Sequence, residues 1–205
     1  MKSSNFDKFF ESCFGSSFYI IREGVDEKAI LGLSGNEKQE AENLLLLNLE
    51  TEKDSYSRPV IALGLLKSKK AIKPLKNRLA VAQGTDLIQT ALALYRIEHS
   101  IEAENIIINY IDEYPTDYMT LYLIAGILPQ FGKTKNVVLS LLELMEKGDL
   151  VGYSATTSLR TLFIDNESIR DILSQILLNS HDAHQPWFVG RKELIEQVKN
   201  TIYET

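Results

Sequence analysis

The sequence predicts an all-α fold built from short pairs of helices. Only 5 prolines and 11 glycines occur in 205 residues, which is too few for a many-turned β-sandwich. Apolar residues recur at the spacing of one helix face, as in Ile72, Leu75, Leu79 and Ala82. Two such helix pairs align with a period of 31 residues, which superimposes Leu63 on Leu94. A pair this short cannot bury its own apolar surface, so it requires stacked neighbours.

The clearest pair runs from Ser57 to Ala82. Ser57 is suited to cap a first helix, and Pro59 is tolerated within its first turn. Residues 67–70 are a basic, polar break before the second helix. We expect Gly84 to end that second helix.

This pair resembles the short HEAT-like repeats of the phycobilisome-lyase type. The matching residues form an alanine-leucine-glycine run in the first helix and an alanine-x-x-proline-leucine phrase in the second: Ala62, Leu63, Gly64, Ala71, Pro74 and Leu75. The resemblance implies a right-handed α–α superhelix, a HEAT/armadillo-like solenoid, of about four to five helix pairs with terminal capping helices. It also implies that the second helices line the concave face side by side.

The other elements follow in order along the chain. Before the clear repeat, helices are expected over 4–14, 26–33 and 37–49; after it, over 86–97, 101–111, 119–128, 135–145, from 154, 166–177 and 191–203. We expect a single HEAT-like repeat domain over 1–205. In it, 1–34 is the N-terminal cap and connector, 35–178 holds the repeats, and 179–205 is the C-terminal cap.

The first helix carries an aromatic face. Its members fall on one side of a helix: Phe6, Phe9, Phe10, Cys13 and Phe14. Such a face either covers the first repeat as an internal cap or binds a partner. The cap is favoured, because exposed aromatic patches promote aggregation.

Composition and charge restrict the function. The net charge of −6 argues against a nucleic-acid partner, which requires a concentrated basic face. Cys13 is the single cysteine, so no intramolecular disulfide forms. The acidic residues near the N-terminus do not suit a signal peptide, and no stretch approaches the roughly 18 apolar residues that span a bilayer. A cytoplasmic protein with no membrane partner is expected.

No catalytic pattern stands out. The sequence holds no nucleophile elbow, phosphate loop or dinucleotide fingerprint. His181 and His184 have the spacing of two metal ligands on a helix, but they precede Pro186 in a loop-like segment without further ligands. The sequence therefore predicts no enzyme activity, no metal site and no cofactor.

Charge is more informative. Six basic residues and no acid lie between Lys67 and Arg78, whereas residues 98–117 hold six acids and no Lys or Arg. If second helices lie side by side, one face gathers six polar residues: Lys73, Lys76, Asn77, Glu102, Asn105 and Asn109. They form either a ladder of salt bridges between repeats, each worth little, or a bipolar groove that binds a mixed-charge protein segment.

The predicted function is a non-catalytic protein–protein interaction module or scaffold, a monomer or weak dimer that binds a protein partner on its concave face. One alternative is an immunity protein that neutralises a bacterial toxin domain. Another is a lyase-type accessory or enzyme of the HEAT-like family.

Overall fold

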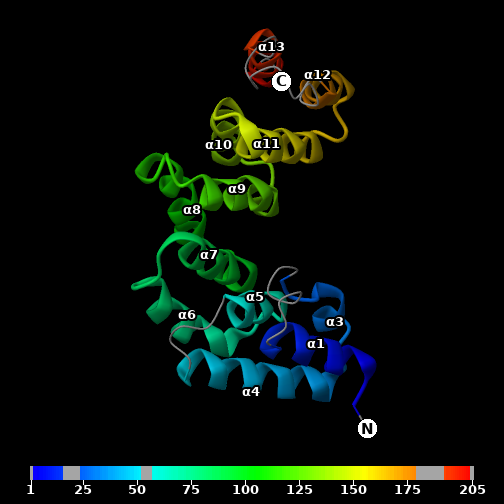
Figure 1. Ribbon diagram of the computed structural model, residues 1–205, viewed down its shortest axis with the longest axis vertical. Helices are drawn as coiled ribbons and strands as arrows, with labels where there is room; N and C mark the ends of the chain where they lie inside the picture. Colours follow the sequence, from blue (N-terminus) through cyan, green and yellow to red (C-terminus); the bar gives the residue numbers. More distant parts are fainter. Residues whose placement is uncertain (1, 16–23, 52–56, 179–191, 204–205) are drawn as a thin grey trace. The chain divides into compact units, whose positions relative to one another are not determined.

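A computed structural model describes residues 2–15, 24–51, 57–178 and 192–203 (Figure 1). In these ranges every regular element is a helix and no strand occurs, so the all-α prediction is confirmed. The chain divides into two compact units, residues 1–106 and 107–205. We describe each unit by itself, and the predicted single array over 1–205 stays a prediction.

The first unit contains seven helical segments in the described residues: α1 Ser4–Phe14, α3 Glu27–Leu31, α4 Gly35–Thr51, α5 Arg58–Leu65, the 3-10 helix η1 Lys69–Ala71, α6 Ile72–Leu79 and α7 Gly84–Glu98. Helix α8, Ile101–Glu113, contains the boundary between the units. The second unit continues with α9 Tyr118–Ile127, the 3-10 helix η2 Leu128–Phe131, α10 Lys135–Glu146, α11 Asp149–Leu162, α12 Glu167–Leu178 and α13 Lys192–Tyr203.

Helix α1 packs against α3, α4 and α5 (Figure 1). Phe6 and Phe9 are buried in contact edge to face, with ring centroids 5.5 Å apart. Phe10 remains 49% exposed. The face is therefore chiefly an internal cap. Ser4 and Asp7 resemble a capping box in the sequence, but the N-cap is Ser3, whose hydroxyl accepts the hydrogen bond from the Phe6 N–H.

Helices α5 and α7 run parallel and pack closely. Ser57 contacts Asp86 and Gly64 contacts Ala93, and both pairs are 29 residues apart, as parallel helices require. A Cβ on Gly64 would lie only 2.8 Å from the Ala93 Cα. Gly64 thus permits a backbone approach that a larger residue would prevent.

Two local predictions in this repeat were wrong. The Ser57 hydroxyl makes no capping bond to α5 but donates to Asp86 Oδ1 at 3.1 Å, since α7 brings that carboxylate within reach. Gly84 does not end α6, which stops at Leu79. It begins α7 with a positive φ of 53°, which its missing Cβ allows.

In the second unit, α9 and α11 are also parallel neighbours. The Ser158 hydroxyl donates to the Ala125 carbonyl at 2.7 Å, 33 residues earlier in the chain. Ser154 lies beside Tyr122 in the same way, 32 residues apart, with a hydroxyl-to-carbonyl distance of 3.5 Å. Helix α10 packs against α11, and α11 packs in turn on α12. Alternate helices in both units thus have a register of about 30 residues.

The remaining predicted helices are present, with shifted ends. Helix α11 begins at Asp149 rather than near Ser154, because Gly148 with φ of 75° turns the chain five residues earlier than expected. The sequence offers Thr116 or Asp117 as the cap of α9 and Asp165 or Asn166 as the cap of α12. The Asp117 and Asn166 side chains are the ones that accept hydrogen bonds, from the Thr120 and Ile169 N–H groups. Residues 179–191, with His181, His184 and Trp187, lie outside the described residues.

Candidate partner-binding groove

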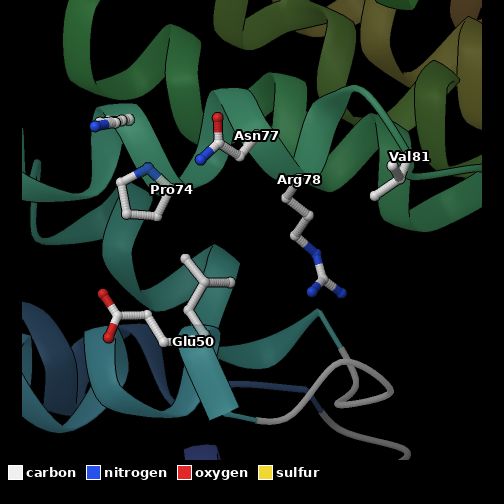
Figure 2. A pocket seen from close by; sticks show the side chains of 7 residues that line it. Glu50, Pro74, Asn77, Arg78 and Val81 are labelled. Carbon is white, nitrogen blue, oxygen red and sulfur yellow. The ribbon is translucent and has the colours of Figure 1, made fainter.

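A groove of about 590 Å³ lies between α4 and α6 in the first unit (Figure 2). Glu50 projects from α4, and Pro74, Asn77 and Arg78 project from α6 on the opposite wall. The full lining is Leu49, Glu50, Lys73, Pro74, Asn77, Arg78 and Val81. Apolar, cationic, amide and carboxylate groups therefore share one open cavity.

Helix α6 presents this wall because of its sequence. Leu75 is its fully buried residue, and it anchors the helix in the core. Pro74 falls in the first turn, where its missing N–H removes no helical hydrogen bond. Lys73 and Asn77, one turn apart and both exposed, consequently stand on the face away from Leu75.

The predicted basic run is partly neutralised within its own unit. Lys70 Nζ lies 2.7 Å from Glu42 Oε2, and the buried Ser68 hydroxyl donates to the other Glu42 oxygen at 2.6 Å. Burial alone would raise the pKa of Glu42, but the hydrogen bonds from Lys70 and Ser68 lower it. Glu42 therefore binds the basic turn to α4.

Arg78 is also fixed by an ionic contact. Its guanidinium donates to Asp86 Oδ1 through Nε at 3.1 Å and Nη2 at 2.9 Å, and its side chain is only 14% exposed. The ion pair with Asp86 therefore holds Arg78 in place in the α6 wall of the groove. Within the described ranges, Lys73 makes no ion pair, so it is the cation in the groove that remains available to a ligand.

Of the six predicted binding residues, Lys73 and Asn77 line the groove. Lys76 instead pairs with Glu98 across 2.9 Å, which forms one rung of the alternative salt-bridge ladder. Glu102 and Asn105 are exposed on α8, as is Asn109 in the other unit. Their grouping with Lys73 on one face stays a prediction.

Sequence reasoning missed the opposite wall and the apolar part of the lining. Leu49 and Glu50 belong to the end of α4, and Val81 follows α6 with 78% of its surface exposed. The leucine-rich run at 44–49 offered a partial signal, because it is too apolar for a helix covered on one side only. Which of its residues faces α6 depends on tertiary packing.

The described residues were also compared with the requirements of a metal site and of a reactive cysteine. No group of three or more metal-ligating side chains occurs in them. Burial raises the pKa of the Cys13 thiol to about 12, so this cysteine is neutral at physiological pH and is not an activated nucleophile.

Comparisons add no further assignment. No helix in the part of the chain that the structure describes combines the length and the apolar character that crossing a bilayer requires. Protein-family models, curated proteins and solved structures were all compared with this chain, and none of them matches it.

Proposed function

We propose that this protein is a non-catalytic protein-binding module of the HEAT-like type, whose partner inserts a segment into the groove between α4 and α6. The observation that carries the proposal is the lining of that groove. Lys73 and Asn77 offer exposed polar groups beside Leu49, Pro74 and Val81. A partner segment can therefore bury an apolar side chain and satisfy a polar one at the same place.

The helix register supports the HEAT-like part of the proposal. Repeat arrays stack helix pairs so that each first helix lies parallel to the next, one repeat further along the chain. The α5–α7 contacts, 29 residues apart, and the α9–α11 contacts, 32 and 33 residues apart, have this character. A superhelix with a concave face follows if the same stacking continues through the chain.

The test places a photo-crosslinking amino acid at Asn77 and, as a matched control, at Lys8, an exposed residue of α1 in the same unit. We expect Asn77 to capture a defined partner in native extracts that Lys8 does not. Lys73→Glu should then weaken the affinity for that purified partner at least fivefold, while Lys8→Glu leaves it unchanged. Equal capture from both positions, or full binding by Lys73→Glu, would refute the groove.

A stability measurement separates binding from the salt-bridge ladder. Lys73 is exposed and without an ionic partner in the described residues, so Lys73→Glu should leave the melting temperature unchanged. Lys76→Glu sets a carboxylate beside Glu98 and should lower stability by about 0.5–1 kcal/mol. If Lys73→Glu instead lowers stability and spares binding, the surface is structural.

The toxin-neutralising alternative names a particular partner for this groove, and a toxin gene beside this one would favour it.

A further inference from the structure

Large apolar side chains gather on one exposed surface of the second unit. Tyr118 is 58% exposed, Met119 73% and Leu150 71%. We name the set the tyrosine surface; its members are Tyr114, Tyr118, Met119, Tyr122, Leu150 and Tyr153. Tyrosine is enriched where proteins bind one another, because its rigid ring offers both an apolar face and a hydroxyl.

The register of α9 and α11 brings the exposed residues of these two helices side by side. Tyr122 lies beside Ser154, 32 residues further along. Because the two helices are parallel, the same offset places Tyr118 beside Leu150. Gly126 continues the exposed face of α9, and a Cβ there would contact only Ser154, at 3.7 Å. Tyr118, Tyr122 and Leu150 are therefore neighbours on the outer faces of the two helices.

The N-terminal end of the surface is held in place by hydrogen bonds and ring stacking. Tyr114 stacks on Tyr110, with ring centroids 4.5 Å apart and planes inclined by 28°. The Tyr110 hydroxyl donates to Asp117 Oδ2 at 2.7 Å, and Asp117 Oδ1 accepts from the Thr120 N–H at 3.2 Å. Hydrogen bonds from Thr120 and Tyr110 lower the pKa of Asp117, which stays ionised beside Tyr118.

Acidic side chains lie near the N-terminal end of this surface. No Lys or Arg occurs between Arg96 and Lys133 in the sequence, whereas Asp112, Glu113 and Asp149 are exposed around the start of α9 and α11. Lys147, the nearest base in the sequence to Asp149, lies 3.9 Å from Glu143. Even so, burial and the nearby Asp112 carboxylate raise the pKa of Glu143. One lysine does not offset the local excess of acid.

We propose that the tyrosine surface is a docking site for a cationic, arginine-containing peptide segment of a partner protein. The guanidinium is planar and weakly hydrated, so it stacks on a tyrosine face and also pairs with carboxylates. Tyr118 and Tyr122, one helical turn apart on α9, supply adjacent rings, and the carboxylates near the start of α9 and α11 attract the cation. This surface is independent of the α4–α6 groove, so either proposal can fail alone.

The experiment titrates the ¹⁵N-labelled protein with three synthetic peptides, (Arg-Gly)₆, (Lys-Gly)₆ and (Glu-Gly)₆, in 50 mM NaCl, and follows amide shifts. We expect (Arg-Gly)₆ to bind most tightly and to shift resonances of α9 and α11. The double variant Tyr118→Ser, Tyr122→Ser should raise its Kd about 5- to 30-fold. Tyr203→Ser, at a tyrosine 63% exposed in the same unit, is the matched control and should leave Kd unchanged.

Conservative variants keep the result decisive. Tyr118→Phe with Tyr122→Phe retains both rings and should restore binding, which a purely structural defect of the serine variant would not predict. Equal affinity of the serine variant and the wild type would overturn the proposal. So would shifts confined to other helices, or tighter binding of (Lys-Gly)₆ than of (Arg-Gly)₆. If sedimentation shows a dimer that the serine variant abolishes, the occupant is a second copy and the proposal is wrong.

Discussion

Replacing Gly64 by alanine tests how closely α5 and α7 are packed. The added methyl carbon would lie 2.8 Å from the Ala93 Cα and 3.0 Å from its Cβ, and both distances are well inside normal carbon contacts. The first neighbour is backbone, so relief requires α5 to move away from α7. Overpacking of this kind costs about 1–3 kcal/mol.

Helix propensity works in the opposite direction. Alanine is favoured over glycine inside a helix by about 0.5–1 kcal/mol. The net expectation is that Gly64→Ala lowers the free energy of unfolding by about 0.5–2 kcal/mol. Urea denaturation followed by circular dichroism at 222 nm measures this as a lower midpoint. Amide exchange should show the loss in α5 and α7.

Gly126→Ala is the matched control, because Gly126 also lies within a helix. Its added methyl would meet only the Ser154 hydroxyl at 3.7 Å, an ordinary contact. This variant should gain the full propensity term, about 0.5–1 kcal/mol. If Gly64→Ala is as stable as Gly126→Ala, the close approach of α5 and α7 is absent and the reasoning is refuted.

Three further predictions concern single side chains. Hydrogen bonds from the Ser3 and Ser34 groups lower the pKa of Glu37 to about 2 from an ordinary value of 4.5. The stabilisation by the Glu37 carboxylate is therefore present above pH 4.5 and is lost as the pH falls toward 2. The melting temperature of the wild type should exceed that of Glu37→Gln above pH 4.5, and this difference should shrink as the pH falls through that window. Cys13, buried and with its pKa raised to about 12, should resist iodoacetamide at pH 8 until urea unfolds the chain, and rapid labelling of the native protein would contradict its burial. Arg78→Met leaves Asp86 without its guanidinium and should cost about 1–2 kcal/mol in urea denaturation; a change below about 0.3 kcal/mol would show that the ion pair contributes little.

The helices could be predicted because their signals are local. Apolar spacing and capping residues act within one or two turns; the Asp26, Ser100 and Asn166 side chains each accept a hydrogen bond from the backbone N–H three residues further on. Ser57 and Gly84 failed for the opposite reason. Their roles depend on Asp86 and on the geometry between α6 and α7, which only tertiary packing establishes.

The candidate site was predictable only in part for the same reason. Excess positive charge identified α6, and Lys73 and Asn77 do line the groove. The sequence did not show that Lys76 would form an ion pair with Glu98. Nor did it show that α4 would supply Leu49 and Glu50 as the second wall of the groove. The tyrosine surface was not predicted, because most of its members come from two helices about 32 residues apart in the chain. Neither helix by itself has a sequence pattern that indicates a binding surface.

The bond from the buried Ser158 hydroxyl to the Ala125 carbonyl has a mechanical consequence. Sliding α11 along α9 by one turn would leave that hydroxyl in an apolar interior without an acceptor, at a cost of about 1–3 kcal/mol. Shear between the two helices is therefore opposed, and their outer faces keep a fixed spacing. Tyr122 and Tyr153 stand on a rigid platform, so a ligand that binds there has little backbone entropy to remove.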